Sequence, residues 1–563
     1  KTASGKVDRL GLPKPADVRE DHVAPRNLTE EIVAGVLAEI LKVDEVSIND
    51  DFFELGGHSL LIPQVTTRLS EIFAIDLPLR ALFDNSRVSE LAATIESLRS
   101  VDRALTEIPI VPIERNGELP MTFAQESLWA IDQISPASGA YNIPRALRLK
   151  GRLDTDALQH SLDAIVRRHE VLRTVFRNND GKPFAVVNPD CKIDLMIRDL
   201  SADPDGEVRF HVAAESRRPF NLSTGPLLRA TVLRLDENEH VLIVTMHHII
   251  SDGWSIRLFF DELVTYYRDS LNGDELQADT LPVQYADFAA WQRNSLPPAT
   301  LNTSLAYWQQ QLADAPAVAE LPVYQPRPAT RTFQGNRHVF EIPAGLTTAV
   351  KQLAKDERVT LFMTLLGAFQ TLLWTYSKHD NIVTGSPSAG RRPGTENLIG
   401  YFVNTLVLKT SFSGNPSFRE IMRRVAQATR DALDHEQAPF AKVVEALQTE
   451  RTLSYNPVFQ VWFVLQAGTG RDERKNFPGL EVEPYPIDSE VTRHDLQLTM
   501  WENSGVLKAA FTYNTDILDL ETVSYMGEQL LMLLARIVDE PQVRANDLRT
   551  LLEQGREERE VLR

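Results

Sequence analysis

The sequence predicts a multidomain protein in which a small all-α bundle of the four-helix type precedes a larger, two-lobed α/β domain. Three observations lead to this fold class. The chain has 563 residues, which at typical domain sizes corresponds to about three to four folding units. Residues 27–99 carry apolar side chains at helical spacing. From residue 118 onward, strand-like and helix-like segments alternate, which is typical of α/β architecture.

The composition excludes several classes of protein. With 43% hydrophobic and 24% charged residues, the chain is neither disordered throughout nor collagen-like. Its one cysteine, Cys191, cannot form an intramolecular disulfide, which favours a reducing compartment, and we expect a cytoplasmic protein. The formal net charge of -19 argues against nucleic acid or an anionic membrane as partner. The longest apolar run, residues 361–374, is too short to span a bilayer.

The first hundred residues divide into a tail and a bundle. Lys, Pro, Arg and Asp dominate the start, so residues 1–24 are expected to form a tail and linker, and residues 25–100 the helical domain. Apolar spacing predicts three helices, at 28–41, from Ser59 onward and near 86–98. A second linker is expected at residues 101–117, which contain two prolines and show no period.

The larger domain is expected to begin at residue 118. The patterns predict two helices, at 154–170 and 254–269, and four strands, at 184–188, 193–197, 226–235 and 240–246. Because a single core of that size is improbable, we expect two lobes. These are the N-lobe, residues 118–290, and the C-lobe, residues 291–550, with residues 551–563 leading away from them.

The segment DDFFELGGHSLL, residues 51–62, is the first that carries chemistry. Gly56 and Gly57 end a loop and Ser59 opens a helix, so a phosphate on its hydroxyl would lie in the favourable field of the helix N-terminus. Serine is also an ordinary helix cap, so its position alone does not identify a site. The whole string, however, resembles the phosphopantetheine-attachment motif of peptidyl carrier proteins.

That resemblance implies a 4′-phosphopantetheine group on Ser59, attached by a phosphopantetheinyl transferase, with His58 beside it. The acidic surface and the size of the helical domain are similar to those of such carriers. The tail TASGKVDR, residues 2–9, resembles the motif that closes an adenylation domain, whose lysine would be Lys6. Residues 1–24 are then the remnant of an adenylation domain and a linker.

A histidine pair in MHHIISDGWS, residues 246–255, follows a predicted strand and precedes a helix. Successive side chains of a strand point in opposite directions, so His247 and His248 cannot both address one site, and no metal is expected there. The spacing from His248 to Asp252 and Gly253 resembles the HHxxxDG motif of condensation domains of nonribosomal peptide synthetases, which have a chloramphenicol acetyltransferase-like fold.

Other blocks extend this resemblance in the family's order over nearly all of residues 118–540. They are TFAQESLWAIDQ at 122–133, RHEVLRTVF at 168–176, YADFAAW at 285–291, TGSPSAGRRPGTENLIGYFVNTLVLK at 384–409, HEQAPF at 435–440 and LSYNPVFQVWFVLQ at 453–466. Two departures concern the acceptor side. Ser127 stands where arginine is usual, and Arg493–His494 precedes Asp495 where the family often has an aromatic residue.

The implied reaction joins a thioester carbonyl to the α-amine of a second thioester. Since a thioester is already activated, much of the catalysis can come from holding the two reactants in line. A neutral imidazole can accept the amine's proton or position the amine, and His248 takes this role by motif position. The backbone N–H of Gly253 is a candidate donor to the negative charge of the tetrahedral intermediate.

The remaining motif residues are expected to support the site. The resemblance implies that Asp252 points away from substrate and pairs with Arg391 to brace the two lobes, and that His247 is a buried scaffold residue. Three further residues are candidates for the substrate tunnel: Trp254, Ser255 and Asn404.

We therefore expect a carrier–condensation didomain that forms peptide bonds. A carrier upstream of a condensation domain presents the donor, so the acceptor belongs to a downstream aminoacyl carrier domain, and adenylation domains lie upstream and downstream in the full synthetase. Residues 551–563 resemble the start of a linker to a following domain. The opening block and SGAYNIP, residues 138–144, resemble the subtype that takes an L-configured donor.

Two alternatives of the same fold remain open. One is an epimerisation domain, which shares the histidine motif, although FVNTLVLK at 402–409 and the opening block look more like a condensation domain. The other is a non-catalytic recruitment module, in which the histidine motif is usually degraded, whereas here it is intact. A cyclisation domain would have an aspartate-based motif in place of HHxxxDG.

Overall fold

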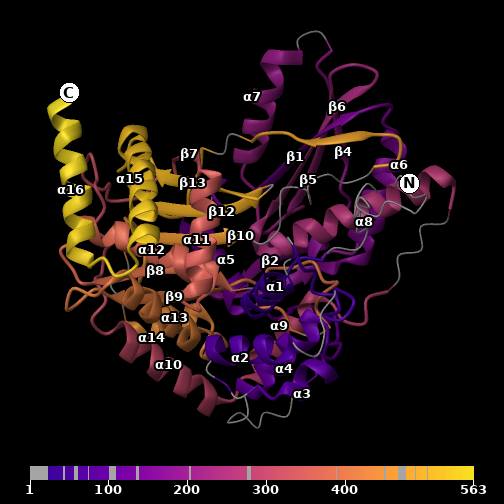
Figure 1. Ribbon diagram of the computed structural model, residues 1–563. Helices are drawn as coiled ribbons and strands as arrows, with labels where there is room; N and C mark the ends of the chain where they lie inside the picture. Colours follow the sequence, from indigo (N-terminus) through magenta and orange to yellow (C-terminus); the bar gives the residue numbers. More distant parts are fainter. Residues whose placement is uncertain are drawn as a thin grey trace, which may run out of the picture.

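The architecture was analysed in a computed structural model (Figure 1). It describes residues 23–562, apart from the following residues: 42, 44, 56–60, 74, 76, 100–108, 135–137, 202–203, 275–279, 389, 393, 449–451, 467–476, 488–489 and 504. Three sequence predictions fall outside the described residues: the carrier serine Ser59, its neighbour His58, and Lys6 of the tail.

The carrier region is a helical bundle around an apolar core. Its helices are α1 (Leu28–Leu41), α2 (Ile62–Phe73), α3 (Leu79–Asp84) and α4 (Val88–Arg99). The Asn27 side chain caps α1, since its Oδ1 accepts the Glu30 N–H at 2.7 Å. The sequence indicated three of these helices. Helix α3 has only six residues, too few for an apolar period to stand out.

The N-lobe is built on a five-stranded sheet. Its helices are α5 (Phe123–Ile134), α6 (Thr155–Arg168), α7 (Pro204–Arg217), α8 (Gly253–Asn272) and α9 (Tyr285–Ser295), and its strands are β1 (Asn142–Lys150), β2 (Thr174–Asn179), β3 (Lys182–Val187), β4 (Leu195–Asp199), β5 (Leu228–Arg234) and β6 (Glu239–His247). The sheet has the order β11-β1-β6-β5-β4, and β2 pairs with β3 separately. Helices α6 and α8 share an apolar core with β5 and β6.

The strand β6 determines where the histidine motif lies. It is antiparallel to both β1 and β5, and its residues from His240 onward are buried. It ends at His247, after which a short 3-10 turn, His248–Ile250, leads to Asp252, the N-cap of α8. The motif thus occupies the turn between a central strand and a long helix, as its pattern predicts.

The C-lobe contains a six-stranded sheet covered by helices. Its elements are α10 (Pro298–Leu312), β7 (Gly335–Glu341), α11 (Ala344–Asp356), α12 (Leu361–Tyr376), β8 (Asn381–Ser388), β9 (Asn404–Ser411), α13 (Phe418–Asp434), α14 (Phe440–Leu447), β10 (Val461–Gln466), β11 (Glu481–Pro484), β12 (Leu496–Asn503), β13 (Val506–Asn514), α15 (Leu520–Asp539) and α16 (Ala545–Leu562). The strand order is β7-β13-β12-β10-β8-β9. Helix α12 is buried along almost its whole length and packs on α11, α13 and α15.

Two segments of the expected C-lobe belong structurally to the N-lobe. Strand β11 pairs antiparallel with β1 and forms the edge of the N-lobe sheet, where it appears as an orange arrow among purple strands in Figure 1. Leu398, Ile399 and Phe402 are buried in the N-lobe core. The boundary expected at 290/291 therefore does not separate the two sheets, because the chain returns twice to the first lobe.

The carrier bundle packs against the C-lobe, beside α13 (Figure 1). Arg99 at the end of α4 pairs with Asp434 of α13 at 2.6 Å. The guanidinium of Arg430 donates to the carbonyl oxygens of Glu71 and Ile72, which lie in the last turn of α2. Cations near the last carbonyls of a helix are favourable, so Arg430 acts as a cap supplied by the neighbouring domain.

Within the described part of the chain, no single helix is long and apolar enough to cross a membrane. The pair α11 and α12 passes that test of length and composition only when taken together, and the two helices meet at a bend of 108°. The same described residues contain no group of three or more His, Cys, Asp or Glu side chains that could hold a metal ion.

Candidate functional site

A cavity of about 1790 Å³ lies where the two lobes and the carrier bundle meet. The N-lobe contributes the start of β1 and of α8, and the C-lobe contributes β12 and the segments before β9 and β12. Ala93 and Glu96 of carrier helix α4 line the same cavity. Of the motif residues, His248 and Gly253 line it.

The orientation of His248 is determined by two hydrogen bonds. Its backbone N–H donates to the carbonyl oxygen of Tyr141 at 2.8 Å, and its ring Nδ1 lies 2.8 Å from the carbonyl oxygen of Ser251. Because a carbonyl can only accept, Nδ1 must carry the proton, and Nε2 then has a free lone pair. Nε2 has no hydrogen-bond partner among the described residues, and the ring lies on the cavity wall.

The surroundings of His248 disfavour its cationic form. Protein surrounds the half-buried ring, which lies edge-to-face with Tyr401 at 4.7 Å between ring centroids. Burial lowers the pKa of His248, and the positive charge of Arg493 lowers it further, to about 3. The imidazole is therefore neutral at neutral pH, with a hydrogen-bond acceptor available on the cavity wall.

The other imidazole has a different environment. His247 is buried, and its Nδ1 accepts the backbone N–H of Ile249 at 3.1 Å. Its ring lies against Phe220, and burial lowers its pKa to about 3. It does not line the cavity. The structure thus places one histidine of the pair at the cavity and the other in the scaffold.

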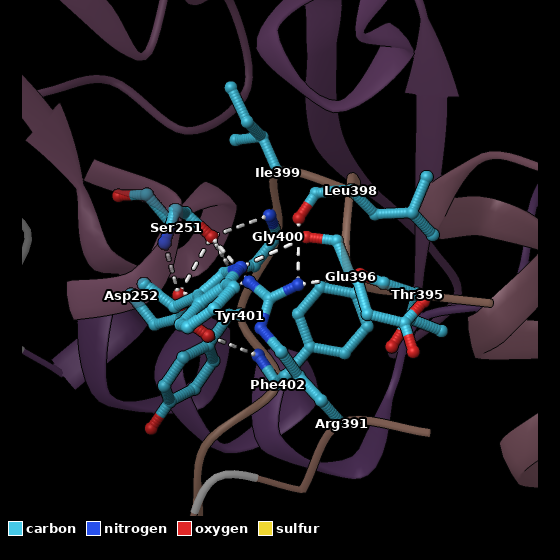
Figure 2. Close-up of polar contacts among 12 residues, drawn as sticks. Ser251, Asp252, Arg391, Thr395, Glu396, Leu398, Ile399, Gly400, Tyr401 and Phe402 are labelled. Atoms are coloured by element: carbon cyan, nitrogen blue, oxygen red, sulfur yellow. Dashed lines mark hydrogen bonds and ion pairs between the residues drawn. The ribbon is translucent and has the colours of Figure 1, made fainter. Parts of the chain in front are cut away.

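Asp252 and Arg391 form a buried contact behind the site (Figure 2). Arg391 Nη2 lies 3.2 Å from Asp252 Oδ1, and Nη1 donates to the carbonyl oxygens of Thr395 and Leu398. The second oxygen of Asp252 accepts the backbone N–H of Phe402 at 3.1 Å. The carboxylate therefore ties the start of α8 to the segment that returns from the C-lobe.

Ser255 belongs to this buried network. It has no exposed surface; its N–H and its hydroxyl both donate to Asp252 Oδ1, and its hydroxyl also donates to the carbonyl oxygen of Gly400. Trp254 Nε1 donates to the carbonyl oxygen of Glu396 at 2.9 Å. Neither Ser255 nor Trp254 lines the cavity, so the tunnel expected at these two residues lies elsewhere.

Asn404 does line the cavity, but its amide is engaged in the protein. Its Nδ2 donates to the carbonyl oxygens of Glu436 and Ala438, and its Oδ1 accepts the N–H of Phe440 at the start of α14. Gly253 begins α8 on the cavity wall, where the first N–H groups of a helix have no partner within the helix.

Sequence patterns missed three residues that surround His248. Tyr141 precedes β1, Tyr401 comes from the returning segment, and Arg493 precedes β12. Arg493 was noticed only as a departure from a motif. The order of residues along the chain could not place it at the site, because its position depends on how β12 and β1 approach across the cavity.

The cavity is compatible with a long, thin acyl carrier arm. Its wall extends from Ala93 and Glu96 on the carrier helix to His248, so an arm attached to the carrier has a path to the imidazole. The chain resumes at Leu61, two residues after Ser59, which is the residue that would hold such an arm.

Comparison with known proteins gives two family matches and many relatives. The model of the condensation domain matches residues 115–559, and that of the phosphopantetheine attachment site matches residues 31–95. The chain is 43% identical to part of the linear gramicidin synthase of Brevibacillus parabrevis over 99% of its own length, but it spans only 7% of that relative.

Among solved structures, the X-domain from teicoplanin biosynthesis superimposes with a TM-score of 0.73 at 25% identity, covering 78% of this chain and 99% of that one. The four-domain nonribosomal peptide synthetase holo-AB3403, bound to AMP and glycine, gives a TM-score of 0.69 at 25% identity, covering 78% of this chain and 34% of that one.

Proposed function

Because the chain belongs to the condensation-domain family of nonribosomal peptide synthetases, with a phosphopantetheine-attachment domain before the condensation domain, we propose that it transfers an acyl or peptidyl group from Ser59 to the amine of an aminoacyl thioester on a downstream carrier. The family, the fold class, the enzyme class and the carrier's prosthetic group agree with the sequence predictions. The individual residues and the direction of transfer are the proposal.

One observation carries the assignment of His248. A neutral imidazole with a free Nε2 lone pair lies on a cavity wall that also includes the carrier helix α4. Nε2 can accept a hydrogen bond from the attacking α-amine and hold its lone pair toward the carbonyl carbon. With a pKa near 3, His248 acts mainly by positioning the amine, since the protonated imidazole is unfavourable at neutral pH.

The other groups have supporting roles. The N–H of Gly253, at the N-terminus of α8, can donate to the negative charge that develops on the carbonyl oxygen. Asp252 and Arg391 hold the two lobes in register, and His247 supports the strand end. The phosphopantetheine arm supplies the thiol that forms the thioester, and this chain's own residues bind and orient the substrates.

The remaining parts of the proposal concern partners and context. A phosphopantetheinyl transferase loads Ser59, and adenylation domains and a downstream carrier act together with this chain in the full synthetase. The residues at 138–144 support an L-configured donor terminus. A cytoplasmic location fits the single cysteine, and the net charge of -19 disfavours nucleic acid and anionic membranes as partners.

The direct experiment supplies the carrier, loaded on Ser59 with a donor thioester, together with a separate carrier loaded with an aminoacyl group. Mass spectrometry should detect the peptide on the acceptor carrier, and His248→Ala should lower its rate by about 10²–10⁴-fold while the melting temperature stays near that of the wild type. Matched L- and D-ended donors test the stereochemistry, and faster transfer from the D-ended donor contradicts that part.

The same experiment separates the alternatives. An epimerisation domain would exchange the α-hydrogen of the loaded residue with deuterated solvent and form no peptide. A recruitment module would do neither, although both carriers are verifiably loaded. If the peptide forms but its acyl group comes from the separate carrier instead of Ser59, the proposed direction is wrong.

A further inference from the structure

Arg493 reaches from the C-lobe to the segment that holds His248. Its Nε donates to the carbonyl oxygen of Ala140 at 3.0 Å, and its guanidinium carbon lies 5.2 Å from the centre of the Tyr141 ring. The next carbonyl along that segment, that of Tyr141, accepts the backbone N–H of His248 at 2.8 Å. Arg493 and His248 are thus attached to neighbouring carbonyls at one end of β1.

The charge of Arg493 has no acidic partner in the described part of the chain. The nearest carboxylate in sequence, Asp495, pairs with Arg327 at 2.5 Å. The Nε bond to Ala140 is the only hydrogen bond of the Arg493 side chain among the described residues, so Nη1 and Nη2 retain their donors. The residue lines the cavity, and burying a cation without a partner is costly.

An arginine that is already paired offers a comparison. Arg391 is also buried, but its terminal nitrogens donate to Asp252, Ser255, Thr395 and Leu398. Its geometry is complete without a ligand. Arg493 has a fixed Nε anchor and two free terminal donors on the cavity wall, an arrangement that suits an oxygen arriving in the cavity.

We propose that the guanidinium of Arg493 binds the carbonyl oxygen of the donor thioester and stabilises the alkoxide that forms there during peptide-bond formation. This proposal rests on the condensation function proposed above. The amine nitrogen forms a bond to the carbonyl carbon, and the carbonyl π electrons move to the oxygen. When the carbonyl re-forms, the C–S bond breaks, the thiolate leaves with the electron pair, and the proton lost by the amine neutralises it.

The electrostatics favour the carbonyl oxygen over the amine as the partner of Arg493. The attacking nitrogen becomes positive as its bond forms, so a cation beside it would raise the barrier, whereas the same cation lowers the energy of the oxyanion. The charge of Arg493 also disfavours protonation of His248. The two residues can then divide the work: His248 Nε2 accepts from the amine, and Arg493 donates to the oxygen.

The test compares Arg493→Gln, Arg493→Lys and the control Arg337→Gln under conditions in which both carriers are loaded. Arg337 lines the cavity at its exposed rim, with its guanidinium 5.6 Å from the Trp501 ring centre, so its loss removes one charge from the same wall. Loss of one oxyanion donor typically costs about 10²–10³ in kcat. We expect that loss in Arg493→Gln, a smaller loss in Arg493→Lys, and wild-type kcat in Arg337→Gln.

A readout on the unloaded protein is independent of turnover. In Arg493→Gln, the pKa of His248 measured by NMR should rise, because the neighbouring cation is gone, while Arg337→Gln should leave it unchanged. If Arg493→Gln does not fold, Arg493→Lys answers the question, since it keeps the charge but not the planar pair of donors.

Three results overturn the inference: an unchanged kcat in Arg493→Gln, a change confined to KM for either carrier, or an equal loss in Arg337→Gln. The second would mean that Arg493 binds an anionic part of a substrate instead of the reacting oxygen. These results differ from a failure of the proposed function, in which the wild type forms no peptide from verifiably loaded carriers.

Discussion

The Asp252 carboxylate accepts a hydrogen bond from Arg391 at 3.2 Å, and both side chains are almost completely buried behind the cavity wall. Asp252 also caps α8, the helix that begins directly after the histidine turn. The aspartate of the motif thus holds the returning segment in place, and the position of Tyr401 against His248 depends on it.

The first prediction concerns this pair. Asp252→Ala and Arg391→Ala should each destabilise the protein by about 3–5 kcal/mol, because each leaves a buried charge without its partner. The double variant should lose less than the sum of the two, since either single change already breaks the contact. Thermal melts of the three variants measure this. Strictly additive losses, or an Asp252→Ala protein of normal stability without activity, would contradict the bracing role.

The second prediction concerns the carrier serine. Incubation with coenzyme A and a phosphopantetheinyl transferase should add one phosphopantetheine mass to the protein, and Ser59→Ala should abolish the addition while the carrier helices remain folded. Intact mass spectrometry and circular dichroism check the two statements. A mass increase that persists in Ser59→Ala would place the attachment elsewhere.

The third prediction concerns pH. Burial lowers the pKa of His494 from its ordinary 6.5 to about 3, so between these values the unfolded chain binds more protons than the folded one. The contribution of His494 to stability is therefore complete above pH 6.5 and is lost as the pH falls toward 3. In His494→Phe, the melting temperature should fall less between pH 7 and pH 5 than in the wild type.

Phenylalanine suits this test because the His494 ring stacks on Trp462 at 4.8 Å between centroids, a contact that another aromatic ring can keep. The wild-type His247, whose pKa is also lowered to about 3, remains as a source of acid sensitivity in both proteins. An identical dependence of the melting temperature on pH in the two proteins would show that His494 titrates normally.

The fourth prediction concerns the carrier contact. Arg430→Ala removes the donors to the last turn of α2, so the carrier should separate more often from the C-lobe, and small-angle scattering should show a larger radius of gyration. Arg423→Ala is the matched control, since Arg423 lies on the same helix with an exposed side chain. Equal scattering curves for the two variants would mean that other contacts hold the carrier in place.

The parts of the fold that the sequence predicted are those with a local periodic pattern. The expected helix at 28–41 coincides with α1, and the strand expected at 240–246 lies within β6, because both bury apolar residues at regular spacing. Helix α3 and strand β11 have six and four residues, too few for a period to show, and both are stabilised by tertiary packing.

The candidate site divides in a similar way. A motif on one turn contains His248, Asp252 and Gly253, so the sequence could single them out together. Arg493 comes from a strand entry far along the chain, and no local pattern joins it to His248. Trp254 and Ser255 follow the motif directly, but the helical turn directs them away from the cavity and into the contact between the lobes.

Strand β11 has a consequence for recombination between related synthetases. It completes the N-lobe sheet although it lies almost two hundred residues after that lobe's last helix, so a chimera that exchanges residues 291–550 also replaces the edge strand beside β1. The incoming strand would have to match Leu147 and Leu149 in register and side-chain size. A graft that exchanges the acceptor-side lobe but retains the native residues around 481–484 preserves this pairing.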